Sequence, residues 1–278
     1  MIPFHKNILS NLKGLNNSMA VVTKEILALS VEIGDALLRN GAEVYRVEDT
    51  VMHVLEAYEI ENYDVYVLSN GIFASANENK DDACSMIRHI PLGSIHLGRV
   101  AAINQLSREI CSHECSLADA WIRLEECKSI PYSSRLTQLI FCGLGCGCFG
   151  YLFGGNLLDA VTSFFIGVLL QLFRDSLNQN KNSKFITNIL GSALVTLLAL
   201  VTMRLGAPTH YDKVIIGGIM PLVPGIALTT SIRDFFNGDY LSGIIHMIDA
   251  VLTAFSIAVG VGAIITIFQF LSGGAFLA

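Results

Sequence analysis

The sequence predicts a membrane protein in which a small cytoplasmic α+β domain precedes an α-helical bundle of about five transmembrane helices. Hydrophobic residues make up 52% of the 278 residues, charged residues make up 15%, and the mean hydropathy is +0.54, which departs from the composition of soluble proteins. Most charges lie before residue 136, and the remainder is almost entirely apolar, glycine or small polar. We therefore expect an N-terminal tail over residues 1–18, a cytoplasmic domain over 19–133 and a transmembrane domain over 134–278.

The net charge, the cysteines and the first residues limit the possible partners and the cellular compartment of the protein. The net charge of -6, with no basic cluster, argues against nucleic acid as a partner. The seven cysteines are an odd number scattered along the chain, which suits a reducing compartment better than a disulfide framework. The first residues show no apolar core followed by a small-residue cleavage site, so we expect the N-terminal domain to stay in the cytoplasm.

Seven elements are expected in the cytoplasmic domain, in the order helix, helix, strand, strand, strand, helix, helix. Apolar residues at helical spacing indicate the helices, and alternation indicates the strands. Asn70–Gly71 predicts a type I′ hairpin turn between the first two strands, because both central residues of that turn need positive φ. The expected elements are Val22–Leu37, Val44–Tyr58, Tyr63–Leu68, Ile72–Ala76, Ser85–Ile90 after a turn at Glu78–Asp82, a helix from about Ile95 to Ile110, and Leu117–Cys127.

The cytoplasmic domain carries no recognisable enzyme motif. It lacks the GxSxG, GxxxxGK, HExxH and GxGxxG patterns, so we expect no catalytic residue and no cofactor. Cys111, His113 and Cys115 do not have a standard zinc spacing, so no metal site is expected. Glu43, Arg46 and Asp49 lie on the polar side of the second helix, where they are either a functional cluster or that helix's solvated face.

Five apolar segments in the C-terminal half are each near the length needed to cross about 30 Å of hydrocarbon. The first is rich in small residues, for which close helix packing is a better explanation than cysteine chemistry, Cys142 and Cys146 included. The expected spans are Leu136–Phe153, Leu157–Phe173, Phe185–Met203, Val214–Ser231 and Leu241–Leu271.

The distribution of Lys and Arg between the loops predicts the orientation. Cytoplasmic loops are enriched in these residues. Lys128, Arg135, Arg174, Lys181, Lys184 and Arg233 fall on the same side as the N-terminus, and Arg204 and Lys213 fall on the other side. We therefore expect the N-terminus in the cytoplasm of a multi-pass inner-membrane protein and the C-terminus outside.

The fourth apolar segment is interrupted midway by Pro221, Pro224 and Gly225. Proline removes a backbone donor and clashes with the preceding turn, so a continuous helix should kink or break there. A broken helix is tolerated in a membrane where it is buried in protein or lines a wet cavity, and transporters use such helices to hold substrates and ions. A simple kink that helps packing is the alternative.

Five ionisable residues lie within or next to the apolar segments. Asp249 lies about two turns into the fifth segment, with His246 one turn before it. Spacing of i and i+3 lets the two share a helix face, where they could carry protons or bind a cation or an ammonium group. Arg233 and Asp234 directly follow the interrupted segment and are either a snorkelling interfacial pair or groups that attract an anionic substrate at a cytoplasmic mouth. Asp159, near the start of the second segment, has either a functional or an interfacial role.

Four stretches together resemble the threonine/serine exporter family, in the form of its N-terminal-type subunit. They are GDALLRNGAEVYRVEDTV (Gly34–Val51), GIFAS (Gly71–Ser75), INQLSRE (Ile103–Glu109) and MPLVPGIALTTSIRDFFNGDYLSG (Met220–Gly243). The resemblance spans roughly Glu25 to Gly262. It implies export of a small polar metabolite such as threonine or serine, and the split bacterial form is similar to a succinate exporter subunit. It also implies a small partner membrane subunit, because full-length members carry about twice as many membrane helices.

These expectations combine into a proton-coupled secondary exporter subunit for small carboxylate-containing metabolites. Its partners are the substrate, the lipid bilayer and the small membrane subunit, with a homo-oligomer left open. Half-helix backbone groups at the proline break would face the substrate carboxylate. The alternatives are a membrane-anchored hydrolase that acts through the N-terminal domain, and a membrane-anchored sensor; an anchor alone would need neither the interrupted helix nor Asp249.

Overall fold

The computed structural model describes residues 4–77, 83–91, 93, 95–178, 183–207 and 210–272. The chain divides into two compact units. Unit 1 comprises Met1–Tyr132 and Arg233–Ile245, and unit 2 comprises Ser133–Ile232 and His246–Ala278. Each unit has its own hydrophobic core.

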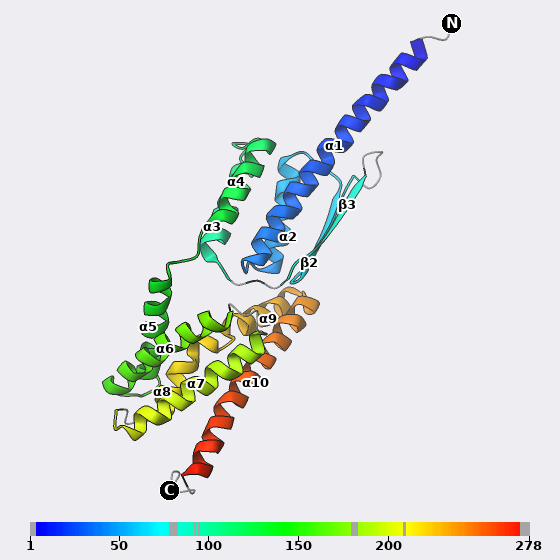
Figure 1. Ribbon diagram of the computed structural model, residues 1–278. Coiled ribbons are helices and arrows are strands. Elements are labelled where there is room, and N and C mark those ends of the chain that lie inside the picture. The colour runs from blue at the N-terminus through cyan, green and yellow to red at the C-terminus, as the bar shows by residue number, and fades with distance from the viewer. Residues whose placement is uncertain are drawn as a thin grey trace. The chain divides into compact units, whose positions relative to one another are not determined.

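Unit 1 contains the seven predicted elements in the predicted order (Figure 1). The first helix begins at Phe4 and therefore also takes in most of the residues predicted as a tail. The turn predicted at Glu78–Asp82 lies outside the described residues. The elements are α1 (Phe4–Arg39), α2 (Val44–Ala57), β1 (Tyr63–Leu68), β2 (Gly71–Ala76), β3 (Cys84–His89), α3 (Leu97–Cys111) and α4 (Leu117–Ser129).

The three strands form one antiparallel sheet in the order β1-β2-β3. Leu68 pairs with Gly71, so the residues of the turn are Ser69 and Asn70, and the prediction of a type I′ turn centred on Asn70–Gly71 is wrong. Neither Asn70 nor Gly71 has positive φ. A Cβ on Gly71 would lie 3.2 Å from the carbonyl oxygen of Arg88, so glycine permits the close approach of β3 at this position.

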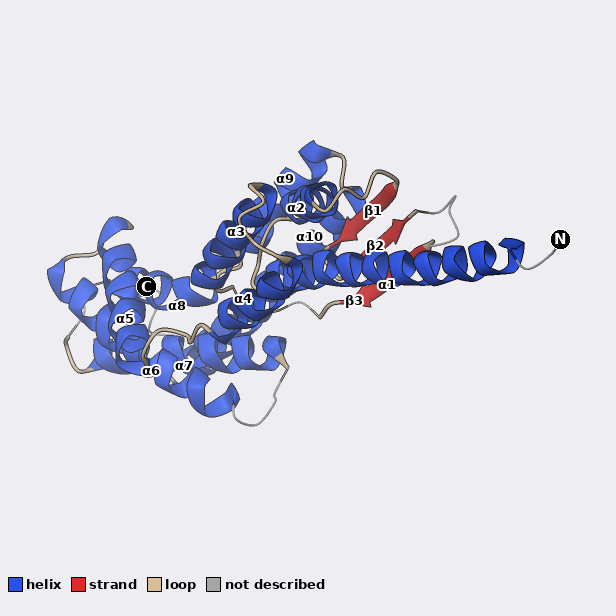
Figure 2. Cartoon of the chain, turned by 90° about the horizontal axis from the view of Figure 1, so that it is seen from above, coloured by secondary structure: helices blue, strands red, loops and turns tan. Residues whose placement is uncertain are grey.

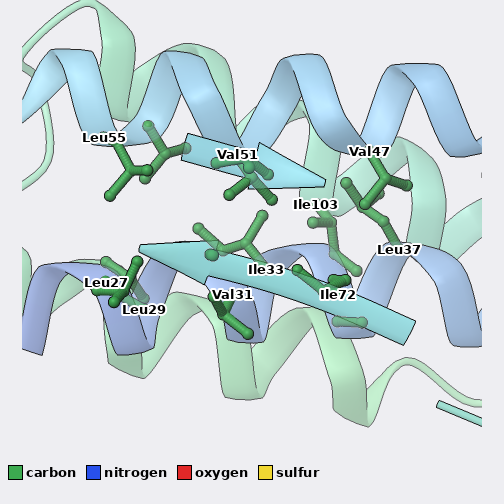
Figure 3. Close-up of a cluster of buried hydrophobic side chains, with 14 of the residues drawn as sticks. Leu27, Leu29, Val31, Ile33, Leu37, Val47, Val51, Leu55, Ile72 and Ile103 are labelled. Atoms are coloured by element: carbon green, nitrogen blue, oxygen red, sulfur yellow. The ribbon is translucent and has the colours of Figure 1, made fainter. Parts of the chain in front are cut away.

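Helices and sheet enclose a core of aliphatic side chains in unit 1. The first helix lies against β2 and β3, and α2 lies against β1 (Figure 2). Ile33 of α1, Val51 of α2 and Ile72 of β2 are fully buried and converge in this core (Figure 3). A Cβ on Gly34 would lie 2.8 Å from both Ile72 and Val51, so the three elements meet at this glycine. Burial of these apolar side chains is the main stabilising contribution to the unit.

Unit 2 is built from helices. They are α5 (Arg135–Leu152), α6 (Leu157–Asn178), α7 (Lys184–Arg204), α8 (Tyr211–Ile219), the 3₁₀ turn η1 (Met220–Leu222), the first part of α9 (Gly225–Asn237) and most of α10 (Tyr240–Leu271). Among the described residues, three helices are long and apolar enough to cross a membrane, namely α6, α7 and α10, or four if the bent pair α8–α9 is one span. The first predicted span forms α5, which carries Arg135, Gln138 and four glycines and is not among the three.

Small residues allow the backbones of α5, α6 and α8 to approach closely. A Cβ on Gly217 of α8 would lie 2.7 Å from the carbonyl oxygen of Cys146 and 2.7 Å from the amide nitrogen of Gly150, both on α5. A Cβ on Gly147 would lie 3.0 Å from the carbonyl oxygen of Ala160 on α6. The interpretation of the small residues in α5 as packing residues is therefore confirmed for Gly147 and Gly150 but not for Gly145, where a Cβ would meet no atom within 4 Å. Close backbone approach of this kind is how membrane helices associate without a hydrophobic driving force.

Helices α7 and α10 run parallel to each other. At one end Lys184 Nζ lies 2.6 Å from Asp249 Oδ2, and at the other Arg204 donates a 2.8 Å hydrogen bond to Ser272 Oγ. Midway, a Cβ on Gly260 would overlap with Ser192 Oγ. The chain leaves α7 at Arg204 and has returned to the Lys184 end by Asp249, so the intervening α8, η1 and α9 carry it back along the length of α7.

Candidate functional site

The interruption predicted at the two prolines is present as a bend of 60° between Tyr211–Leu222 and Gly225–Asn237. Pro221 lies in η1, Pro224 lies between the helical segments and Gly225 begins α9. A Cβ on Gly225 would contact no atom within 4 Å, so this glycine faces open space and is not needed for close packing. The geometry is that of a broken helix, which is more than a kink within one.

A broken helix brings two unlike helix ends close together. The last carbonyl groups of α8 and the first amide groups of α9 lack partners within their own helices. The Val223 amide donates a 3.1 Å hydrogen bond to the carbonyl of Met220, and the Leu228 amide donates a 3.0 Å hydrogen bond to the carbonyl of Pro224. These bonds satisfy some of the terminal backbone groups, and other groups lack a partner within their own helix. The partial positive charge of the α9 N-terminus and the partial negative charge of the α8 C-terminus are suited to the two ends of a small zwitterion or to an anion.

Asp249 forms an ion pair that the sequence did not reveal. Its carboxylate lies 2.6 Å from the ammonium of Lys184, the first residue of α7. The Asp249 side chain is 23% exposed and that of Lys184 is 55% exposed. His246 is half-buried one turn earlier on α10. A carboxylate that already holds an ammonium group is able to hold a substrate ammonium in the same place.

The two predicted charged motifs meet in unit 1. Arg233 of α9 forms an ion pair with Glu43, which precedes α2, and Arg46 Nε lies 3.8 Å from the same carboxylate. Glu43 therefore lies between two guanidinium groups, one that is 190 residues away in the sequence (Arg233) and one that is three residues away (Arg46). Asp49 is not part of this group, since its side chain is exposed and pairs with His53 on the same helix at 3.3 Å.

Two carboxylates with raised pKa values are Glu48 on α2 and Asp239 between α9 and α10. Burial raises the pKa of Glu48, with a smaller contribution from Asp239, and the hydrogen bond that Glu48 accepts from the Val67 amide at 3.0 Å opposes the shift. Burial and the neighbouring Asp234 raise the pKa of Asp239. Asp234 is buried, with 1% of its surface exposed. Sequence reasoning missed Glu48 and Asp239, although both lie within the motifs that carry the family resemblance.

The end of α9 and the start of α10 are also tied to the sheet of unit 1. Ser242 Oγ accepts a 3.1 Å hydrogen bond from the amide of Ser69, in the turn between β1 and β2. Ser242 is fully buried. This contact joins the turn that precedes the motif GIFAS to the end of the motif Met220–Gly243.

Asp159 has a structural role at the start of α6. It is fully buried and accepts hydrogen bonds from the amides of Asn156 and His210 at 2.9 Å and 3.2 Å. His210 Nδ1 lies 2.9 Å from the same carboxylate, and Asn156 Oδ1 accepts from the Asp159 amide at 2.8 Å. This reciprocal pattern is a capping box, which fixes the helix terminus against the residue that precedes α8.

The cysteines are spread over helices, a strand and a loop, and they range from buried to exposed. Cys146 is fully buried between helices, and Cys111 Sγ lies 3.7 Å from the carbonyl oxygen of His53. Burial raises the pKa of Cys111 and of Cys115, which lowers the reactivity of these thiols. Over the part of the chain that the structure describes, no group of three or more His, Cys, Asp or Glu residues is arranged to hold a metal ion.

Comparison with known proteins gives a consistent picture. The family model described as "Putative threonine/serine exporter" matches residues 28–268. A "Probable threonine/serine exporter" of Mycobacterium tuberculosis is 26% identical over 86% of this chain, which spans only 45% of that relative. The "Probable succinate transporter subunit YjjP" of Klebsiella aerogenes is 22% identical over 86% of this chain and 92% of its own length. The protein of the same name from Escherichia coli is 22% identical over 88% and 95%. No solved structure matches the chain.

Proposed function

Because the chain belongs to the threonine/serine exporter family, whose model covers most of it, we propose that it is one subunit of a secondary exporter for small carboxylate-containing metabolites. The family and the relatives are exporters or transporter subunits and not enzymes. The single structural observation that carries the proposal is the broken helix pair, with its 60° bend at Pro221 and Pro224. A membrane anchor has no need for such a bend, which exposes helix ends to a bound solute.

The proposed membrane arrangement has five crossings, with the N-terminus in the cytoplasm of the inner membrane. The parallel contacts of α7 and α10 support counting α8–η1–α9 as a full crossing, since a re-entrant loop would return the chain to the side it came from. The distribution of Lys and Arg supports the orientation; of those residues, Lys181 lies outside the described ones. The α5 segment would be the first crossing, with its small residues packed against α6 and α8.

In the proposed mechanism, the substrate carboxylate binds the exposed amides at the start of α9, and Asp249 exchanges Lys184 for the substrate ammonium or for a proton. The attraction between Asp249 and a cation is stronger in a partly dehydrated site than in water. His246, on the same face of α10, would share the proton. We propose proton coupling because a proton that binds Asp249 would release the cation from this carboxylate in each cycle.

A small partner membrane subunit would complete the transporter. The chain spans less than half of the M. tuberculosis relative but nearly all of the two relatives named as succinate transporter subunits. The most apolar window of α10 is only 22% buried, which leaves apolar surface for lipid or for the helices of a partner. Two subunits would then supply the two halves that many transporters build from repeats.

Export measurements on the intact chain test this function. We expect co-expression with the proposed small membrane subunit to lower the intracellular pool of threonine, serine or succinate and to raise its external concentration, relative to either subunit alone. Vesicles with an imposed pH gradient would then show whether flux needs protons. Unchanged pools of all three solutes in the co-expressing cells would contradict the proposal.

The Glu43–Arg233 pair, which joins the residue before α2 to α9, is proposed to act as a cytoplasmic gate. Glu43→Gln or Arg233→Gln should change the export rate several-fold with little change in stability, because a partly exposed pair contributes only about 0.2–1 kcal/mol. Glu109→Gln is a matched control, since Glu109 pairs with Arg123 at similar exposure. If the charge-swapped double variant of Glu43 and Arg233 exports no better than the single variants, the pair is not a gate.

A further inference from the structure

Unit 1 contains a cavity that the exporter function does not use. Its volume is about 540 Å³, within the range of pockets that bind small molecules. Its lining combines both signs of charge. The charged lining residues are Glu32, Asp35, Arg39, Arg99 and Lys128, with Asn40, Tyr132, Ala36, Pro91 and Gly93 completing the wall.

One carboxylate oxygen at this cavity is buried without a partner. Asp35 is 7% exposed, and its Oδ2 accepts a 2.6 Å hydrogen bond from Arg39 Nε. Its Oδ1 has no hydrogen-bond partner within the described part of the chain. A buried carboxylate oxygen that lacks a donor costs free energy, so a donor that enters the cavity and reaches Oδ1 would be stabilised there.

Arg99, a cation at the same cavity, forms no ion pair with a carboxylate of the described residues. Arg99 Nε donates a 2.8 Å hydrogen bond to the carbonyl of Ile130, and its guanidinium lies 5.2 Å from the centre of the Tyr132 ring. No ion pair involving Arg99 is found in the described residues. Lys128, by contrast, is held by Glu32 at 2.6 Å and Glu125 at 2.8 Å. The terminal nitrogens of Arg99 are therefore available to a bidentate anion.

We propose that this cavity binds a small zwitterion of the α-amino acid class, with the ammonium group on Asp35 and the carboxylate on Arg99. A dicarboxylate would satisfy Arg99 but would bring a second negative charge to Asp35, and a simple amine would leave Arg99 without a partner. The site belongs to unit 1, whereas the broken helix and Asp249 belong to unit 2 apart from the end of α9. It is therefore a binding site that is additional to the proposed transport pathway and does not depend on it.

Binding to the purified full-length chain tests the inference. Calorimetric titrations with L-threonine, succinate and 1-amino-2-propanol would compare a zwitterion, a dicarboxylate and an amine. We expect binding of threonine alone, and a loss of affinity of about tenfold or more in Asp35→Asn and in Arg99→Gln, since each removes a hydrogen bond to a charged group. Glu25→Gln is the matched control, because Glu25 is an exposed carboxylate on the same helix.

Two measurements keep the result separate from folding and from transport. The single Trp121 lies on α4 in unit 1, so its fluorescence reports whether the variants of that unit are folded. Titration in the Asp249→Asn background removes a residue of the proposed pathway, and binding at Asp35 should persist there. Unchanged threonine affinity in folded Asp35→Asn and Arg99→Gln, or succinate binding that equals threonine binding, would overturn the proposal. Failure of export in cells would leave this binding result unaffected.

Discussion

Replacement of Asp249 by asparagine is expected to lower export by about tenfold to about a hundredfold while the protein still inserts into the membrane. The carboxylate holds Lys184 at 2.6 Å, and the same group is proposed to hold the substrate ammonium or a proton. A hydrogen bond to a charged group contributes about 1.5–3 kcal/mol, which converts to that change in rate. Efflux of radiolabelled threonine, serine or succinate from loaded cells measures it, alongside the amount of protein in the membrane fraction.

A second ion pair in unit 2 provides the control for Asp249. Asp212 lies 3.1 Å from Lys213 at the start of α8, and Asp212→Asn should leave export unchanged. The charge-swapped variant Asp249→Lys with Lys184→Asp should restore the ion pair but not export, because the carboxylate would have moved to α7. Normal efflux from Asp249→Asn, or full recovery in the swapped variant, would reduce the pair to a structural contact.

Replacement of Gly217 by alanine is expected to destabilise unit 2 by about 1–3 kcal/mol, the usual cost of overpacking. The added Cβ would lie 2.7 Å from backbone atoms of both Cys146 and Gly150, and backbone atoms cannot move aside as a flexible side chain would. Helices α5 and α8 would have to separate, which would also shift the broken helix that begins at the end of α8. A lower unfolding temperature in detergent and a smaller folded fraction in the membrane are the expected results.

Gly145 of α5 offers the matched substitution. A Cβ at Gly145 would meet no atom within 4 Å, so Gly145→Ala should be neutral or stabilise the helix by up to about 1 kcal/mol. Gly225 has the same open surroundings. Gly225→Ala should therefore leave the stability of unit 2 unchanged. Equal stability of the Gly217 and Gly145 variants would show that the α5–α8 contact is looser than described.

Local patterns in the sequence were sufficient to predict the elements but not their partners. The order of helices and strands in unit 1 follows from spacing, and the break follows from Pro221 and Pro224, since both depend on neighbouring residues. The hairpin turn was misplaced because Gly71 serves the close approach of β3, a tertiary requirement that the dipeptide Asn70–Gly71 does not reveal. Residues 4–18 continue α1, although their sequence shows little of the pattern that marks its buried part.

In the candidate site, the sequence identified individual residues but not the residues that they contact. Asp249 was identified because a carboxylate in an apolar segment is unusual, but its partner Lys184 is 65 residues away and has no feature to distinguish it from other loop lysines. The contact between Glu43 and Arg233 joins two motifs that were recognised separately. Asp35 and Arg99, by contrast, have ordinary surroundings in the sequence, and only the cavity brings them together.

The contacts between α7 and α10 at the two ends of α7 bear on how the protein responds to the thickness of the bilayer. Lys184 and Arg204 are the first and last residues of α7, about 30 Å apart along the helix, and about 30 Å is also the thickness of the hydrocarbon layer. Each is held by a polar group of α10, so the two contacts would lie at the two water interfaces. A thinner or thicker lipid mixture would then strain one contact or the other, which would make the protein sensitive to hydrophobic mismatch.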